Sequence, residues 1–165
     1  MLNLRVRSRI TIAFYSLIIL FSPLAQQTAF GDDSPFVTKI VEGSFDEIYT
    51  GLKDVITGKG INIAHTLGAS DMLNRTGPAF GIKKNVYINA ETVEFCSAKI
   101  SHRLAAADPE NVVLCPFTIS VYVTTDDPKN VRLTYRKPVA NKGSEAVLGE
   151  IVTLIEDIIK EATDW

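Results

Sequence analysis

The sequence predicts a two-layer α+β domain in which helices cover one face of a β-sheet. Two segments, 44–57 and 144–162, place their apolar residues on one helical face. A third segment, 112–124, alternates apolar and polar residues, as does a strand with one buried face. The order along the chain is strand, helix, four strands with a small helix inserted, and a long helix. Amphipathic helices and a sheet with one polar face pack together in two layers.

The first half of the domain is expected to contain a strand, a helix and a second strand. Residues 36–41 predict the first strand. Ser44 is expected to cap the helix that follows, and Glu47 stands three residues later, as in a capping box. Two glycines end this helix, and the alternation over 61–66 predicts the second strand. The predicted buried face of the helix consists of Phe45, Ile48, Tyr49, Leu52, Val55 and Ile56.

A long connection, residues 67–85, follows the second strand. Three glycines and a proline interrupt it, although residues 69–75 could form one or two helical turns. Connections of this length are uncommon in compact domains and are often functional or mobile. A binding loop and a simple excursion of the chain both remain open as interpretations.

The second half of the domain contains three strands and two helices. In order, the expected elements are strand 86–95, helix 97–107, strand 112–124, turn 126–130, strand 131–135 and helix 144–162. Ser97 is expected to cap the short helix, and Asp108-Pro109 to stop it. Ser144 starts the last helix, whose apolar stripe faces the sheet. That stripe consists of Val147, Leu148, Ile151, Leu154, Ile155, Ile158 and Ala162.

The N-terminus has the layout of a secretory signal peptide. Three arginines and no acid precede an apolar run at 10–21, and small residues follow at Ala29 and Gly31. A dozen apolar residues are too few to span a bilayer, which needs about 20. We therefore expect residues 1–31 to be removed near Gly31, leaving a single domain, 32–165, that is periplasmic or secreted and has no stable membrane anchor. An uncleaved N-terminal anchor is the alternative.

The charge of the expected mature chain argues against nucleic acid as a partner. Three of the 17 Lys and Arg residues lie in the signal peptide, which leaves 14 against 19 acidic residues and a net charge near −5. Phosphate binding needs clustered positive charge.

The segment 94–123 resembles a bacterial family known as domain of unknown function 302. The resembling features are Phe95-Cys96-Ser97-Ala98 opening a short helix, Ala107-Asp108-Pro109 closing it, and Cys115-Pro116 opening a strand that ends in Val121-Tyr122. The resemblance implies an antiparallel sheet covered by helices, of the β-α-β4-α kind, similar to that of TATA-box-binding proteins. It also implies a homodimer, and it implies no enzymatic activity, because the family has none assigned. It does not imply DNA binding, because a fold does not carry a function.

Both cysteines lie beside the inserted helix. If the flanking strands are antiparallel, as the resemblance implies, Cys96 and Cys115 lie at the same end of the sheet. Three interpretations remain open. The first is a structural disulfide, which would close about 20 residues and add roughly 3 kcal/mol. The second is a dithiol or ligand site for haem, copper or zinc, with His102 as a further ligand, and the third is a pair of separate buried thiols.

Several polar residues could serve a site. Cys96 precedes a predicted helix N-terminus, which favours its thiolate, so a catalytic Cys96 with His65 or His102 as its base is one hypothesis. Buried or surface histidines without a role are the alternative. Asn74 and Arg75 could, with Tyr135, supply polar contacts to a small ligand under the long connection.

The leading hypothesis is an exported, non-enzymatic, dimeric binding or accessory protein whose partner is a small ligand or an exported protein. Its site is expected at the Cys96–Cys115 end of the sheet, under the 67–85 connection. A redox, haem-binding or metal-binding protein that uses these two sulfurs is the alternative, and an enzyme is the third class. The sequence contains no HExxH, CxxC, CxxCH, P-loop or GxSxG motif.

Overall fold

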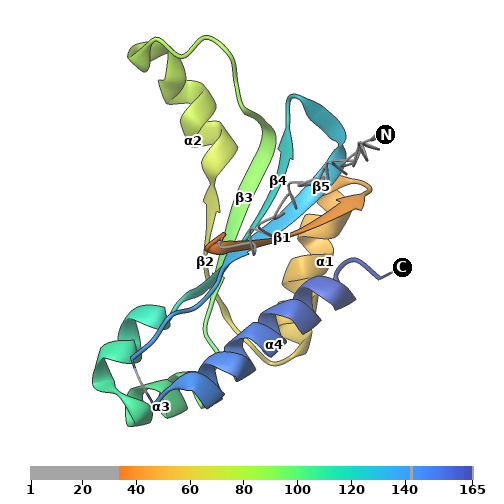
Figure 1. Cartoon of the computed structure of the whole chain (residues 1–165). Helices are drawn as coiled ribbons and strands as arrows, with labels where there is room; N and C mark the ends of the chain where they lie inside the picture. Colours follow the sequence, from red (N-terminus) through yellow and green to blue (C-terminus); the bar gives the residue numbers. More distant parts are fainter. Residues whose placement is uncertain (1–33, 142, 165) are drawn as a thin grey trace, which may run out of the picture. The chain divides into compact units, whose positions relative to one another are not determined.

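A five-stranded antiparallel sheet with helices packed against it forms the domain (Figure 1). The structure is a computed structural model, which describes residues 34–141 and 143–164. The described elements are β1 (Phe36–Glu42), α1 (Phe45–Gly58), β2 (Ile63–Gly68), α2 (Ala69–Thr76), the 3-10 helix η1 (Gly77–Phe80), β3 (Tyr87–Phe95), α3 (Ala98–Ala107), the 3-10 helix η2 (Pro109–Leu114), β4 (Phe117–Thr124), β5 (Asp127–Arg136) and α4 (Glu145–Glu161). This order confirms the predicted α+β class and the inserted helix. The predicted signal peptide and its cleavage site lie outside the described residues.

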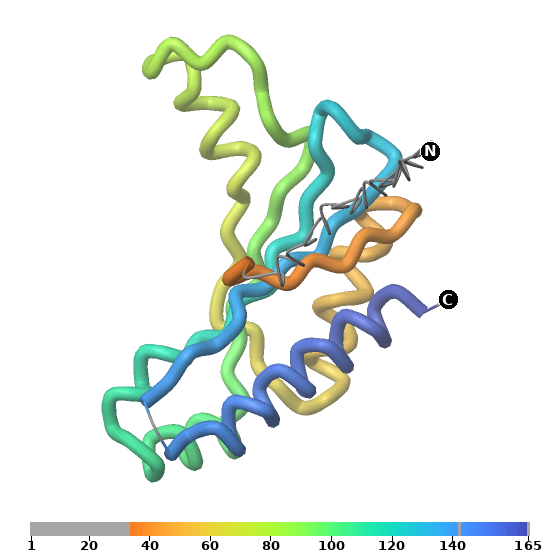
Figure 2. Tube along the Cα trace, in the orientation of Figure 1, coloured from red at the N-terminus to blue at the C-terminus, as the bar shows by residue number. Residues whose placement is uncertain are grey.

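The strand order is β1-β5-β4-β3-β2, and every neighbouring pair is antiparallel. β4 lies in the middle, and its residues alternate between buried and half-buried along its whole length. The buried positions face α1 and α4, which lie on the same side of the sheet (Figure 2). The half-buried positions face the other side, which we call the open face.

The core lies between the sheet and the two long helices. From α1 it receives Ile48, Leu52 and Ile56, which are fully buried, as the helical periodicity predicted. From α4 it receives five isoleucine and valine side chains, of which Ile159 extends the predicted stripe. The strands contribute Val93, Phe95, Phe117, Ile119, Val121, Val123, Val131, Leu133 and Tyr135. Apolar side chains buried in this way are each worth roughly 1.5–3 kcal/mol.

The three serines that were predicted to start helices behave differently. Ser44 caps α1 as expected, and its side chain accepts a hydrogen bond from the Glu47 backbone N–H at 3.5 Å. Ser97 precedes α3 but makes no side-chain capping hydrogen bond. Ser144 is fully buried at the start of α4 and instead accepts a hydrogen bond from the Asn111 side chain at 2.8 Å. Asn111 also donates to the Leu104 carbonyl, so it joins the α3–η2 segment to α4.

The predicted start of the fourth strand, at Val112, is wrong. Residues 109–114 form η2 instead, and β4 begins only at Phe117. Asp108 causes the difference, because its side chain accepts a hydrogen bond from the Glu110 N–H at 2.8 Å and caps the 3-10 helix. Local capping therefore overrides the high strand propensity of two consecutive valines.

Two other predicted boundaries also shift. β2 begins at Ile63 rather than at Ile61, because the Ile61 N–H donates to the Ile56 carbonyl and Ile61 packs into the core as part of a loop. The predicted turn 126–130 is a two-residue turn at 125–126, and its remaining residues begin β5. A register shift between Tyr122 and Thr124 accompanies this tight turn.

The buried Tyr135 predicts how the stability of the fold changes at high pH. Burial, and then the hydrogen bond from its hydroxyl to Glu156 on α4, raise the pKa of Tyr135 to about 12. The protonated Tyr135 hydroxyl therefore contributes fully to stability below the pKa of about 10 that this tyrosine has in the unfolded chain. That contribution is lost as the pH rises towards 12. We expect the urea midpoint of Tyr135→Phe to fall less steeply than that of the wild type above about pH 10. Parallel slopes in the two proteins would contradict this assignment.

Candidate functional site

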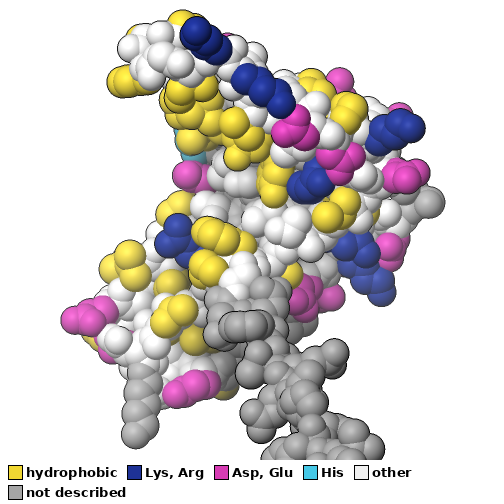
Figure 3. Space-filling view, turned by 45° about the horizontal axis from the view of Figure 1, so that its top comes forward, with side chains coloured by type: hydrophobic (Ala, Val, Ile, Leu, Met, Phe, Trp, Pro, Cys, Tyr) yellow, Lys and Arg dark blue, Asp and Glu magenta, His cyan; other side chains and the backbone are white. Residues whose placement is uncertain are grey.

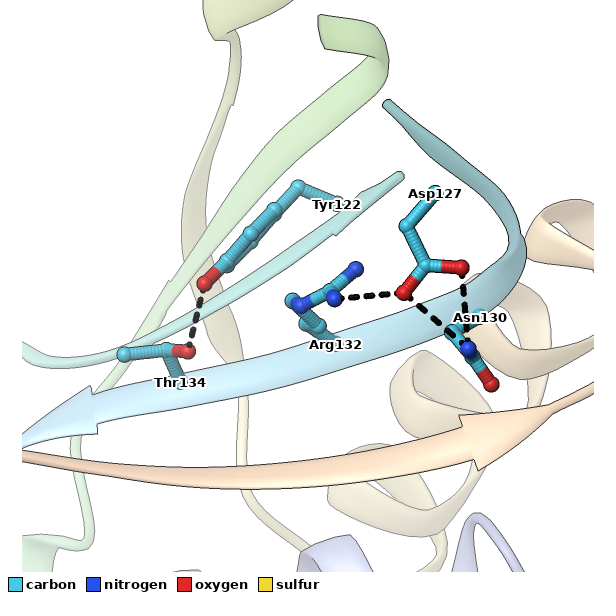
Figure 4. A network of polar contacts seen from close by, with 5 residues as sticks. All are labelled: Tyr122, Asp127, Asn130, Arg132 and Thr134. Atoms are coloured by element: carbon cyan, nitrogen blue, oxygen red, sulfur yellow. Dashed lines mark hydrogen bonds and ion pairs between the residues drawn. The ribbon is translucent and has the colours of Figure 1, made fainter. Parts of the chain in front are cut away.

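The open face of the sheet carries a row of hydroxyl groups. The register places Thr38, Thr134, Ser120 and Thr92 directly opposite one another on four adjacent strands. The Thr38 and Thr134 hydroxyls are 2.8 Å apart, and the same distance separates those of Thr92 and Ser120. The Thr134 hydroxyl also donates to the Tyr122 hydroxyl at 3.3 Å (Figure 4). Along each strand these residues alternate with the core residues, because successive side chains of a strand point to opposite faces of the sheet.

α2 turns part of this face into a groove of about 350 Å³. Thr92, Ser120, Tyr122 and Thr134 line it from the sheet. Ala69 and Leu73 line it from α2, where a spacing of four residues places them on one helical face. Phe36 of β1 also lines it and is 46% exposed. The volume is at the lower end of the range for small-molecule sites, about 300–1,000 Å³.

A charged network lies beside the groove on the same face (Figure 4). Arg132 is directly opposite Tyr122, and its Nη2 donates to Asp127 at 2.6 Å. Hydrogen bonds from Asn130 and then from Arg132 lower the pKa of the Asp127 carboxyl below its usual value. The Nη1 atom of Arg132 is buried and has no hydrogen-bond partner among the described residues. A guanidinium group with an unused, desolvated donor is a cost that water or a polar ligand atom would relieve.

The two cysteines form a disulfide, with their Cα atoms 5.8 Å apart. Phe95 pairs with Phe117 in the antiparallel β3–β4 ladder, so Cys96 and Cys115 lie at the same end of the sheet, as the family resemblance implied. The structural disulfide is thus the interpretation that the structure shows, and the hypothesis of two separate thiols is wrong. In the disulfide, neither sulfur is a thiolate that could bind haem, copper or zinc or act as a nucleophile.

The histidines are not brought together with the sulfurs. His102 is exposed on α3, next to Arg103, which forms an ion pair with Glu150 of α4. His65 is exposed on the edge strand β2, where it is opposite Glu94. Within 34–141 and 143–164, no three His, Cys, Asp or Glu residues are grouped closely enough to hold a metal ion.

The expected location of the site was wrong in one respect. The disulfide and the 67–85 connection lie at opposite ends of β3, because Cys96 follows its last residue and the connection precedes its first. A site cannot therefore lie at the disulfide end and also under the connection. α2 and η1 occupy most of the connection, and α2 borders the groove, although Asn74 and Arg75 do not line it. Tyr135 is on the helix-covered face and cannot join them.

A second hollow, of about 860 Å³, lies at the disulfide end between α3, α4 and the loop before β2. Cys96 and Ser97 line it, together with several charged residues. Two of those charges are already neutralised, since Lys59 pairs with Glu161 at 2.6 Å and Glu150 pairs with Arg103. The open-face groove is the better candidate site because its apolar walls are exposed and no other described segment covers them, a feature that marks binding surfaces.

Sequence reasoning did not identify Arg132, Tyr122 or the hydroxyl row as a site. One feature of the sequence does indicate a polar face on this strand, because the polar residues of strand 112–124 alternate with its core residues. Which strands lie beside it, and in which register, is not encoded in that pattern. Only the register shows that four hydroxyls form one row and that Arg132 stands next to Tyr122.

Comparison with known proteins places these features in a family. Residues 37–164 match the family model described as "Domain of unknown function DUF302". The chain belongs to this family. A crystal structure of an uncharacterized conserved DUF302 protein from Bacillus stearothermophilus is similar, with a TM-score of 0.58 and 17% sequence identity. The match covers 79% of this chain and 96% of that one, and at this identity it shows a shared fold. No curated protein matches the chain.

Removing the disulfide of this DUF302 domain should destabilise it without unfolding it. The bond closes a loop with a sequence separation of 19 residues, and the core formed by α1, α4 and the sheet does not include either sulfur. We expect Cys96→Ala with Cys115→Ala to lose about 3 kcal/mol of unfolding free energy in urea, and to retain the far-UV spectrum of the wild type. A loss of that spectrum would show that the disulfide is needed for folding itself.

Proposed function

We propose that this DUF302 protein is an exported binding protein without enzymatic activity, and that it holds a small amphipathic molecule in the open-face groove. The observation that supports this most directly is the composition of the groove. Its floor carries hydroxyl groups, and its sides carry the exposed apolar side chains of Leu73 and Phe36. Small-molecule sites combine apolar walls with a few polar groups in this way.

The hydroxyl groups of the groove favour binding over catalysis. A serine or threonine nucleophile needs a general base within hydrogen-bond reach. Here the hydroxyls of Thr92 and Ser120 pair with each other, and that of Thr134 pairs with Thr38 and Tyr122. These groups can still accept or donate one further hydrogen bond each, which is the role expected of a binding floor.

Export is supported by two independent features. The N-terminal 31 residues have the layout of a signal peptide, and the domain contains a disulfide, which persists in oxidising compartments. Within 34–141 and 143–164, no helix is long and apolar enough to span a bilayer.

The redox or cofactor-binding alternative requires the Cys96–Cys115 bond to open, so we give it second place.

Intact mass spectrometry of the protein from a periplasmic fraction tests export. We expect the mass of a chain that begins at Asp32, lower by two hydrogen atoms than that of the reduced chain. No alkylation should occur without a reductant, because both sulfurs are in the bond. A chain that begins at Met1 would contradict cleavage, and rapid labelling of one cysteine would promote the redox alternative.

A fluorescent amphipathic probe, 8-anilinonaphthalene-1-sulfonate, tests the groove. The folded mature chain should bind it saturably, and Leu73→Ser should weaken binding about tenfold by removing one apolar wall. Val113→Ser is the matched control, because Val113 is 80% exposed at the other end of the sheet. Equal weakening by both variants, or no saturable binding, would contradict the proposed site.

The homodimer that the family resemblance implies stays a prediction. β1 is an edge strand whose Phe36 and Ile40 side chains are exposed, so the described residues offer an apolar surface there. The oligomeric state of the mature chain in solution decides it.

A further inference from the structure

The segment between β2 and β3 extends beyond the end of the sheet as an arm (Figures 1 and 2). We define the arm as residues 69–86, which comprise α2, η1 and the return to β3. Of the twelve large hydrophobic side chains that are exposed in the described residues, five are on the arm, namely Met72, Leu73, Phe80, Ile82 and Val86. Phe80 is 79% exposed, so the largest apolar side chain of the arm is almost fully in water.

The arm has the opposite charge to the rest of the domain. The arm has three basic residues and one acidic residue, Asp71, whereas the rest of 32–165 has 11 basic and 18 acidic residues. Lys84 pairs with Asp126 at the base of the arm. Arg75 and Lys83 are exposed and have no ion pair with any described residue. The space-filling view shows basic and hydrophobic side chains together on the outer part of the arm (Figure 3).

The tip of the arm, which we define as residues 75–83, is held in one conformation by hydrogen bonds of its own backbone. The Ile82 N–H donates to the Gly77 carbonyl at 3.0 Å, and the Gly81 N–H donates to the Pro78 carbonyl at 3.2 Å. Gly81 has a φ of +76°, which a side chain would disfavour, so the glycine permits this tight reversal. Phe80 is therefore presented outwards from a closed turn, and a partner would pay little entropy to order it.

We propose that the tip of the arm docks on an anionic lipid bilayer. Phe80 and Ile82 enter the boundary between headgroups and acyl chains, and Arg75 and Lys83 lie against lipid phosphates. Binding to an anionic interface combines buried apolar area with attraction of nearby cations, and the tip offers both. The acidic body would remain outside the headgroup layer, where screening over about 8 Å limits its repulsion.

The shape and charge of the tip favour a bilayer over the other partners. A small molecule needs a concave site, whereas the tip protrudes, and neither Phe80 nor Ile82 lines the groove. Contact between the arms of two copies would bring like charges together around Arg75 and Lys83, which is unfavourable. This inference goes beyond the proposed ligand binding, and either one can fail without the other.

Vesicle co-sedimentation of the full mature chain tests the proposal. The wild type should bind vesicles of phosphatidylcholine with phosphatidylglycerol at about 0.15 M salt, and bind poorly to pure phosphatidylcholine or at about 1 M salt. Phe80→Ser with Ile82→Ser should lose at least about tenfold in affinity. Lys83→Glu should lose about thirtyfold, from roughly 1 kcal/mol for each unit of charge near the surface.

Matched controls alter similar residues at the other end of the domain. Val113→Ser with Val139→Ser removes two valines that are 80% and 79% exposed, and Lys99→Glu reverses a charge on α3. Both should bind like the wild type. No binding by the wild type, or equal losses in the controls, would overturn the proposal. A dimer that forms without vesicles and is abolished by Phe80→Ser would also overturn it, because the tip would then be an interface between copies.

Discussion

The structure depends on the alternation of side chains along the central strand β4. Phe117, Ile119, Val121 and Val123 point to one side and are buried under the helices. Thr118, Ser120, Tyr122 and Thr124 point to the other side and stay half-buried. A shift of register by one residue would exchange the two sets, placing hydroxyls in the core and aliphatic groups in water. The same constraint that holds α1 and α4 on the sheet thus also builds the floor of the groove.

The two ends of the domain are held by different kinds of interaction. At one end the disulfide, the buried Asn111 and the ion pair between Arg103 and Glu150 join α3 and η2 to the strands and to α4. At the other end, the arm is held mainly at its base, where the Thr125 N–H donates to the Val86 carbonyl and Lys84 pairs with Asp126 on the surface. Exposed ion pairs are worth at most about 1 kcal/mol. Local opening should therefore cost less free energy at the arm than at the disulfide end.

Much of the fold could be predicted from the sequence because it follows from local periodicity. The faces of α1 and α4 and the alternation of β4 depend on spacing alone, and they were correct. Errors arose where a single hydrogen bond decided the local structure. Asp108 converted a valine-rich stretch into η2, and a two-residue turn replaced a predicted turn of five residues.

The candidate site was harder to predict because it depends on which strands are neighbours. Cys96 and Cys115 are conspicuous in the sequence, but their disulfide leaves no free sulfur. Arg132 and Thr134 are unremarkable in the sequence, and their position beside Tyr122 follows from the β4–β5 register. Threonines at alternate positions indicate a solvent-facing side of a strand, and no feature of one strand alone shows that a row of them continues across four.

The unequal distribution of charge has a consequence for how the molecule meets other charged bodies. A net positive arm on a net negative body separates charge between the two parts of the domain, which gives it an electric moment. In the electric field of a charged surface, such a molecule experiences a torque before it makes contact with that surface. It would rotate during diffusion so that the arm leads towards negative charge and the acidic body trails. The first collision would then be already oriented, and a larger fraction of encounters would be productive.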